Sequence, residues 1–384
     1  MSWPIPVFVP VKLPEPVSLR VWLPALVAIA SSAAGAVLLL WPHGKPTQAI
    51  QFWILLIGAP LVACGFVLGW RLNRWETDQL VADETEREQT RLMSLWKQWC
   101  RRRVKIARAV AFLPIDETVA SLADPNVDLP VNAQRSAGLS WLEKGEARRA
   151  CFLSLVAECF ADALRGRREM TLTLMLADVL PEQFEGWATS THSVFTRAIP
   201  DVAFKVEVRP VVGCDTWLTQ QVDCLYNLPQ LIIAAQLWPG DETTLDFSEG
   251  AAALLIDPDA SQPNHVFRSM TTAAATLDAG LAQLVQMQVA PDRITHGWLT
   301  GCTDESAAIT VALTTDPKKP LIERSLDHIV GRPGPISSWI VLATALEASQ
   351  AGGAHLVAWR EPEDESLHLC MVTHAEPQAS RKEY

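Results

Sequence analysis

The sequence predicts an α/β protein in which two membrane-spanning helices precede a helical stalk and a large folded body. Three observations lead to this prediction. Two apolar segments, residues 21–41 and 49–70, contain no charged residue. A long segment without proline or glycine follows at residues 73–111. Beyond it, apolar strand-like stretches alternate with helical ones, as in a sheet that is covered on both faces.

Each apolar segment is long enough to cross about 30 Å of hydrocarbon as an α-helix. The polar linker at residues 42–48 is too short to do more than reverse the chain, so both ends of the pair lie on one side. Arg20 precedes the first helix, and Arg71 and Arg74 follow the second. Because such residues remain in the cytoplasm, we expect residues 21–71 to form a membrane hairpin whose ends are cytoplasmic.

The segments that flank the hairpin differ in character. Residues 1–20 contain five prolines, which fix φ and remove N–H donors, so we expect an extended cytoplasmic tail. Residues 72–109 form the predicted stalk helix, with acidic residues first and basic residues last, as the helix dipole favours. The polar C-terminal residues 375–384 are expected to be disordered.

The end of the stalk is a candidate surface for binding a protein partner. Trp96 and Trp99 lie on one face of the predicted helix, beside Arg101, Arg102 and Arg103. Tryptophan and arginine are the residue types that most often dominate the energies of interfaces. In the alternative interpretation, the same stripe packs onto the acidic body and orients it.

The body is predicted in two halves, residues 110–258 and 259–374, with Asp257-Pro258 at the boundary. The predicted strands are residues 171–177, 202–210, 230–237, 251–257, 293–299, 355–359 and 367–373. The predicted helices are residues 140–164, 181–198, 269–287, 305–314 and 335–350. Together they predict a sheet with helices on both of its faces.

Charge and cysteine content exclude several classes of function. The net charge is −11; residues 1–74 carry five basic residues and one acidic residue, so the remainder has a net charge of −15. An acidic body does not suit nucleic acid, so we expect no nucleic-acid partner. Eight cysteines occur without a CxxC pair, and we expect neither disulfides nor a metal site. No phosphate-binding loop or hydrolase motif is present, and no cofactor is expected.

Three segments resemble parts of the β-ketoacyl synthases, in the order in which that family has them. They are Phe247–Ile256 with its acidic-Gly-Ala strand entry, the strand and loop of Pro291–Ile294 and Thr300–Glu305, and the glycine-rich turn Asp327–Ile336. The resemblance implies a thiolase-like α/β/α domain of two halves over about residues 110–374. It also allows a homodimer, since thiolase-like domains usually pair through a central strand.

The same resemblance implies where an active site would lie. The family uses a cysteine at a helix N-terminus and two histidines that stabilise the developing oxyanion. Cys214 stands between a strand and a helix, where the nucleophile belongs, but Thr300 and Arg332 fall at the histidine positions. A guanidinium cannot act as a base, and no other histidine stands in a matching place. We therefore expect Cys214, Thr300 and Arg332 to line a remnant pocket in a protein that is not an enzyme.

The overall plan resembles accessory membrane proteins of type VI secretion systems, including the lipase-adaptor group. This resemblance implies a non-catalytic adaptor in a bacterial inner membrane, anchored by residues 21–70, with both termini and the body in the cytoplasm. Its partners would be secretion components or effector cargo. One alternative is a membrane-anchored enzyme that condenses or transfers acyl thioesters through Cys214. Another is a structural subunit whose hairpin packs against other membrane helices.

Overall fold

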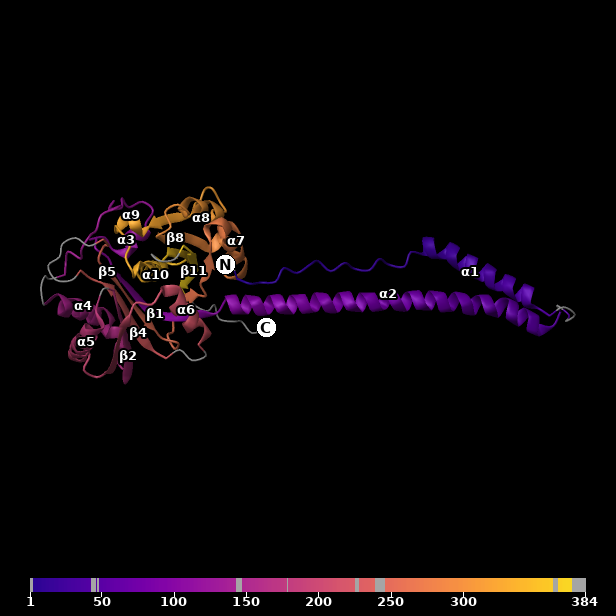
Figure 1. The fold of residues 1–384 in the computed structure, drawn as a ribbon, viewed down its shortest axis with the longest axis horizontal. Coiled ribbons are helices and arrows are strands. Elements are labelled where there is room, and N and C mark those ends of the chain that lie inside the picture. The colour runs from indigo at the N-terminus through magenta and orange to yellow at the C-terminus, as the bar shows by residue number, and fades with distance from the viewer. Residues whose placement is uncertain are drawn as a thin grey trace. The chain divides into compact units, whose positions relative to one another are not determined.

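The computed structural model describes residues 3–42, 46, 48–142, 147–177, 179–224, 228–238, 246–361 and 365–374. The chain divides into two compact units (Figure 1). One is Pro6–Trp96, and the other, called the body below, is Met1–Ile5 together with Lys97–Tyr384. The predicted tail at residues 375–384 lies outside the described residues.

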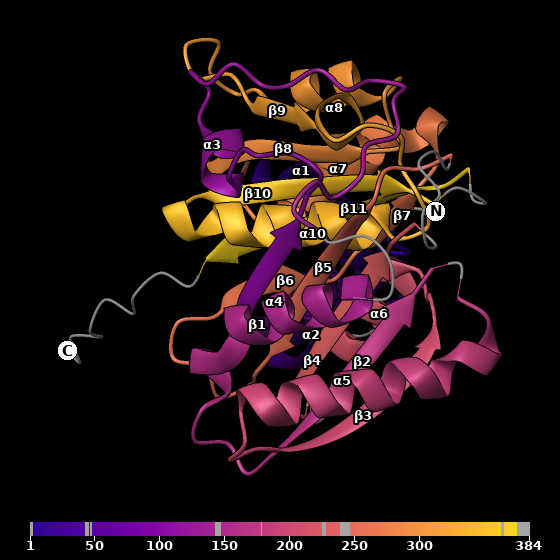
Figure 2. The same cartoon turned by 90° about the vertical axis from the view of Figure 1, so that its left-hand side faces the viewer.

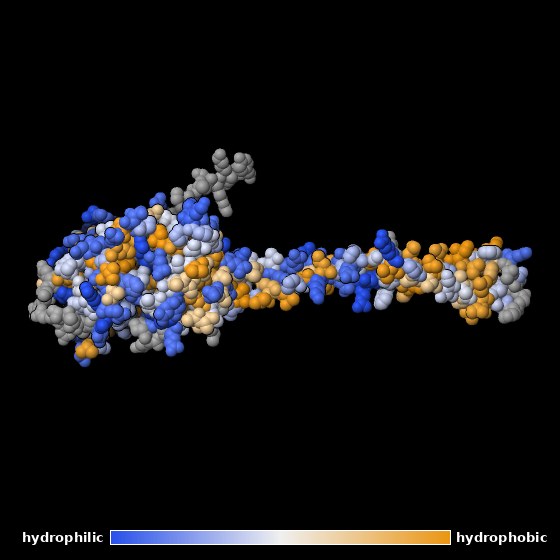
Figure 3. Space-filling model, turned by 90° about the horizontal axis from the view of Figure 1, so that it is seen from above, coloured by the Kyte–Doolittle hydropathy of each residue, from blue (hydrophilic) through white to orange (hydrophobic). Residues whose placement is uncertain are grey.

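The Pro6–Trp96 unit contains α1 (Leu19–Leu40) and most of α2 (Ile50–Cys100). As expected from the prolines, no helix or strand forms over residues 3–18. Both helices contain a stretch long and apolar enough to cross a membrane, and nearly all of its side chains face outward. Figure 3 shows apolar residues gathered on this part of the chain, with more hydrophilic ones farther along α2.

The predicted stalk helix is confirmed only as far as Cys100, because β1 (Arg103–Phe112) follows almost at once. Val104 and Ile106 are fully buried, whereas Arg103 and Lys105, which alternate with them, are exposed. This alternation has the period of two that a strand requires. Neighbouring strands pair with β1 on both sides, so the sheet satisfies backbone groups that a longer helix would have satisfied internally.

The body is built on one sheet, which has eleven strands within the described residues. The strands that follow β1 in its first half are β2 (Glu169–Leu176), β3 (Ala203–Pro210), β4 (Gln230–Gln236) and β5 (Gly250–Ile256). The second half contains β6 (Asn264–Phe267), β8 (Ile294–Thr300), β9 (Ile322–Ser325), β10 (Ala354–Arg360) and β11 (Leu367–His374). The short strand β7 (Met270–Thr272) pairs with β11 off the main path.

The two halves of the sheet repeat one topology. The strand order is β3-β2-β4-β5-β1 followed by β6-β11-β10-β8-β9. Leaving β7 aside and counting strands within each half, both halves read 3-2-4-5-1 from their outer edges. In each half the fifth strand is antiparallel to the fourth and the first, and the remaining pairs are parallel. The chain therefore contains an internal structural duplication, joined where β1 pairs with β6.

Helices cover both faces of the first half. On one face lie α4 (Ala147–Leu164) and α5 (Phe184–Ala198), which Figure 2 shows side by side. The opposite face packs against α10 (Ser337–Ala348), which is buried on almost all sides. Successive residues of β4 point to opposite faces and enter different apolar clusters, Leu231 in one and Ile232 in the other. This double burial explains why the central strands read as continuous apolar runs.

The remaining helices are shorter. They are α3 (Val119–Ala123), α6 (Cys214–Asp223), α7 (Leu277–Met287), α8 (Ser306–Leu313) and α9 (Leu326–Ile329). The predicted helix at residues 269–287 is wrong at its start, because Met270 and Thr272 are buried in β7. The predicted helix at residues 140–164 is α4, which begins at Ala147; residues 143–146 lie outside the described part. The halves as separate domains remain a prediction.

Candidate active site

Cys214 is the first residue of α6, and its side chain is fully buried. Three residues separate the end of β3 from the start of the helix, so the end of that strand places the thiol. Burial raises the pKa of the Cys214 thiol well above its usual range, and the carboxyls of Glu361 and Asp215 raise it further. The thiol is therefore protonated at neutral pH and needs a base before it can act as a nucleophile.

The Glu361 carboxyl lies at the start of α6, directly after the end of β10. It lies close to the Cys214 backbone N–H. A Cβ on Gly213 would lie 3.5 Å from Glu361 Oε1, an ordinary contact distance, which places the carboxyl beside the start of the helix. Burial raises the pKa of the Glu361 carboxyl, while the Ser338 hydroxyl, His368 and the Cys214 N–H oppose the increase. A carboxyl with a raised pKa is a better proton acceptor than an ordinary one.

His368 brings an imidazole to the same place from β11. Its Nδ1 lies 3.7 Å from Asp215 Oδ2 and 3.2 Å from Thr271 Oγ1. Its ring stacks on Trp359 with the ring centroids 5.6 Å apart. We call Cys214, Asp215, Glu361 and His368 the Cys214 centre.

The sequence analysis therefore missed a histidine that lies beside Asp215 at the start of α6. Sequence reasoning missed Glu361 and His368 because neither belongs to a motif. One signal was present: Glu361 follows the apolar strand β10, and the carboxyl ends of parallel strands commonly carry ligand-binding residues.

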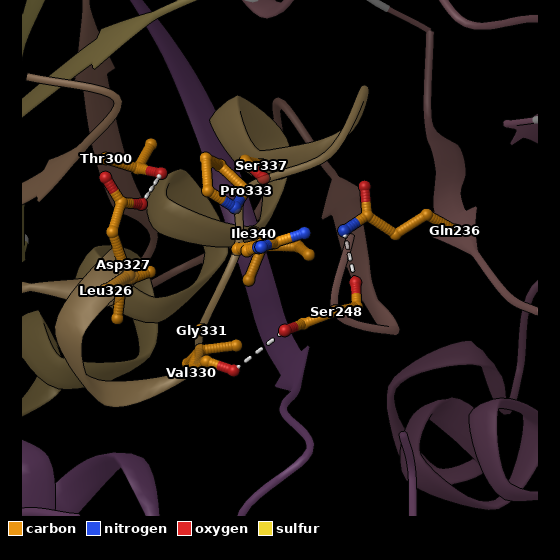
Figure 4. Close-up of a pocket in the computed structure, with 11 residues that line it drawn as sticks. Gln236, Ser248, Thr300, Leu326, Asp327, Val330, Gly331, Pro333, Ser337 and Ile340 are labelled. Carbon is orange, nitrogen blue, oxygen red and sulfur yellow. Dashed lines mark hydrogen bonds between the residues drawn. The ribbon is translucent and has the colours of Figure 1, made fainter. Parts of the chain in front are cut away.

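Thr300 lies instead in a second polar region, around a cavity of about 20 Å³ (Figure 4). Its hydroxyl donates to Asp327 Oδ1 at 2.6 Å, and the Gly301 N–H donates to Asp327 Oδ2 at 2.7 Å. Burial raises the pKa of the Asp327 carboxyl, and these two donors oppose that increase. Ser248 lines the same cavity and donates its hydroxyl to the Val330 carbonyl at 3.0 Å.

Arg332 also lines this cavity but is half-exposed. Its Nε donates to the Gln134 carbonyl at 3.1 Å, and its guanidinium lies 3.7 Å from Asp246. The guanidinium is therefore held at the surface.

Thr300 and Arg332 line this cavity and Cys214 does not, so the remnant pocket expected from all three residues stays a prediction. The first turns of α10 contribute to both regions, with Ile340 lining the cavity and Ser338 beside Glu361. We call the region around Thr300, Asp327 and Arg332 the Thr300 cavity.

Trp99, Arg101, Arg102 and Arg103 of the candidate partner surface have partners within the body. Trp99 lies under the guanidinium of Arg268, with 3.9 Å between the guanidinium carbon and the ring centroid. The three arginines have partners in the body, namely Met287 O for Arg101 (2.8 Å), Asp223 for Arg102 (3.1 Å) and the Phe267 ring for Arg103 (5.9 Å). All of these contacts lie within the body. The partner-binding role of Trp96, Trp99, Arg101, Arg102 and Arg103, and the alternative that the segment orients the body, both stay predictions.

Comparison with known proteins finds similarity at the level of structure. No family model matches the sequence, and no curated protein matches it. Among similar solved structures, the tetronic acid condensing enzyme AbyA1 is 13% identical, with a TM-score of 0.45 over 70% of this chain and 99% of that chain. OleA from Xanthomonas campestris, in a variant solved with cerulenin, is 16% identical, with a TM-score of 0.39 over 72% and 98%. ChlB3, named an acyltransferase, is 12% identical, with a TM-score of 0.44 over 72% and 98%.

At these identities the likeness concerns the fold alone. It agrees with the thiolase-like part of the resemblance seen in the sequence. AbyA1 is named a condensing enzyme and ChlB3 an acyltransferase, which contradicts our prediction that this chain is not an enzyme, and we withdraw that prediction. The comparison does not bear on membrane insertion or on type VI secretion.

Proposed function

We propose that this protein is a membrane-tethered, thiolase-like enzyme that condenses or transfers acyl groups from thioesters, with Cys214 as the acyl acceptor. The observation that carries the proposal is the Cys214 centre. It combines a thiol at the first residue of a helix with a carboxyl of raised pKa at the same helix end. The Asp215–His368 pair lies beside them. A nucleophile, an adjacent base and a group that orients them are the parts that covalent acyl transfer requires.

The reaction follows from the positions of these groups. Cys214 Sγ attacks the thioester carbonyl carbon, and the thiol proton passes to the Glu361 carboxylate. Negative charge then develops on the carbonyl oxygen, where N–H groups at a helix N-terminus stabilise an anion.

Collapse of the tetrahedral intermediate completes the transfer to the enzyme. The donor leaves as a thiolate and takes the proton back from Glu361. The acyl group remains on Cys214 as a new thioester, ready for an acceptor. Because the sulfur is fully buried, the acyl donor reaches it only after a neighbouring side chain moves.

Membrane attachment is the second part of the proposal. Large apolar side chains of α1 and α2 face outward, including Leu39 (82% exposed), Leu61 (67%) and Phe66 (77%). Exposing such surface to water costs about 25 cal/mol per Å², a cost that hydrocarbon removes. Residues 3–5 and the chain from Lys97 belong to the same compact body, which supports both ends of the hairpin lying on one side. The flanking arginines favour the cytoplasm.

The acyl-transfer proposal is tested with the full-length protein in detergent and a short-chain acyl thioester of N-acetylcysteamine. Intact mass measurement should find one acyl group added, and peptide mapping should place it on Cys214. Cys214→Ala should abolish the addition, whereas Cys302→Ala should retain it because Cys302 is buried elsewhere, between Ala358 and Asp327. Addition that survives in Cys214→Ala, or no addition to any cysteine, would overturn the proposal.

A further inference from the structure

Trp3 is buried in the body although the residues that follow it in the N-terminal tail are largely exposed. Only 7% of its surface is accessible, whereas Val7 is 94% exposed. The residues Met1–Ile5 belong to the same compact unit as Lys97–Tyr384. The start of the chain is therefore attached to the body by specific contacts, and the exposed tail follows.

Both the side chain and the backbone of Trp3 are bound. The indole Nε1 donates to the Ser269 carbonyl at 3.2 Å. Gln283 Nε2 donates to the Trp3 carbonyl at 3.1 Å. The indole also meets Trp99 edge to face, with ring centroids 6.0 Å apart. A buried tryptophan whose N–H is paired is typical of a residue that anchors an interface.

We propose that Trp99, Ser269 and Gln283 form a peptide-docking site whose ligand is the chain's own N-terminal segment, Trp3–Ile5. No covalent bond holds this segment in place, so docking is an equilibrium. Two features favour the docked state. The ligand is tethered to its site, which gives it a high effective concentration. The prolines that follow stiffen the tether and reduce the entropy that docking removes.

Docking closes a loop in the chain. The α1–α2 segment leaves the body after Ile5 and returns to it at Lys97, so the body is held at both ends of that segment. When Trp3 is released, only the continuous helix α2 connects the two units. The docking site therefore closes the segment between Ile5 and Lys97 into a loop. This proposal is independent of the acyl chemistry at Cys214.

The test uses the full-length protein in detergent and a fluorescein-labelled peptide with the sequence of residues 1–8. Trp3→Ala empties the site, so fluorescence anisotropy should report peptide binding at least about 10-fold tighter than to the unaltered protein, whose own tail competes. Trp53→Ala is the matched control, because Trp53 lies on α2 and is 54% exposed. It should bind the peptide as weakly as the unaltered protein does.

Two further measurements locate the site and its occupant. Adding Gln283→Ala to Trp3→Ala should weaken peptide binding, and a peptide with alanine in place of tryptophan should bind at least about 10-fold more weakly. Native mass spectrometry should give the same oligomeric state for Trp3→Ala and the unaltered protein. Absence of peptide binding to Trp3→Ala would overturn the proposal. A dimer that Trp3→Ala converts to a monomer would overturn the assignment of the ligand to the same chain.

Discussion

The Cys214 centre and the Thr300 cavity both border α10, yet their polar groups are satisfied to different degrees. In the Thr300 cavity each oxygen of the Asp327 carboxylate accepts a hydrogen bond. In the Cys214 centre two carboxyls crowd a buried thiol, and Oε1 of Glu361 has no hydrogen-bond partner within the described residues. A satisfied buried network stabilises one conformation. Groups whose pKa values are shifted by burial and by neighbouring like charges are more typical of catalytic sites.

This difference teaches that the position of a residue in a motif is weaker evidence for a catalytic role than the environment of its side chain. Thr300 and Arg332 occupy the positions that a resemblance assigns to catalysis, but their hydrogen bonds are structural. Glu361 and His368 occupy no motif, but they lie beside the one thiol that begins a helix in the described residues. Substitutions in the two regions should therefore affect different measurements.

The largest effect is expected for Glu361→Gln, which preserves shape but removes the proposed base. The rate of Cys214 acylation should fall by about 100-fold or more, the usual contribution of a general base. In the unaltered protein the rate should rise with pH as Glu361 ionises, because only the carboxylate accepts a proton. That rise should lie above the ordinary carboxyl pKa of 4.5, since burial raises the pKa of Glu361.

Stopped-flow acylation followed by mass measurement between pH 5 and 8 tests this prediction for both proteins. The variant should lack the carboxyl-dependent rise. Its free energy of unfolding at pH 7 should equal or exceed that of the unaltered protein, because glutamine removes the cost of burying a charge. A variant that acylates at the unaltered rate would exclude Glu361 as the base and leave the Asp215–His368 pair to fill that role.

Gly331→Ala should produce the next largest effect, on stability. Gly331 lines the Thr300 cavity with φ of +105°, and a Cβ there would overlap the Arg135 carbonyl oxygen. Backbone strain and this overlap together should cost at least about 3 kcal/mol of unfolding free energy. Gly352→Ala is the matched control, because its φ is +107° but nothing lies within 4 Å of the added carbon. With φ of 107° and ψ of 171° it should cost only the backbone strain, about 1–3 kcal/mol.

Urea denaturation of both glycine variants separates strain from steric overlap. The difference between them measures how rigidly the Thr300 cavity is built. Equal losses in the two variants would mean that the cavity yields easily, and the contrast with the Cys214 centre would then disappear.

The parts of the fold that sequence predicts well are those with one dominant pattern. The central strands β4 and β5 are apolar along their whole length because both of their faces are buried. In contrast, β1 was missed because its basic residues continue the charge gradient of α2 and resemble a helix C-terminus. This segment forms a strand because it pairs with β5 and β6, which are far away in the chain.

The same reasoning explains what was found and missed in the candidate site. Cys214 could be predicted because a strand, a glycine and a helix start are local features. Glu361 and His368 come from β10 and β11, and their approach to Cys214 depends on the order of strands across the whole sheet. The separation of Thr300 from Cys214 depends on the buried course of α10. Neither dependence leaves a local trace in the sequence.

The smallest effects should come from the two residues that motif position alone would make catalytic. Thr300→Val removes one of the two donors to the buried Asp327 carboxylate at nearly constant volume, so it should cost about 1–2 kcal/mol. The loss should shrink as pH falls through the pKa of Asp327, because a protonated carboxyl needs fewer donors. Arg332→Ala should cost less than about 1 kcal/mol, since its ion pair with the fully exposed Asp246 is screened by water.

Neither substitution should change the rate of Cys214 acylation if the Thr300 cavity and the Cys214 centre are separate. The separation of the two regions is tested by measuring the acylation rate of each variant, together with its unfolding free energy from urea denaturation at pH 7 and pH 5. A tenfold fall in acylation for Thr300→Val, with Arg332→Ala unchanged, would join the two regions through α10. The cavity would then act on the thiol through the first turns of that helix, where Ile340 borders the cavity and Ser338 borders Glu361.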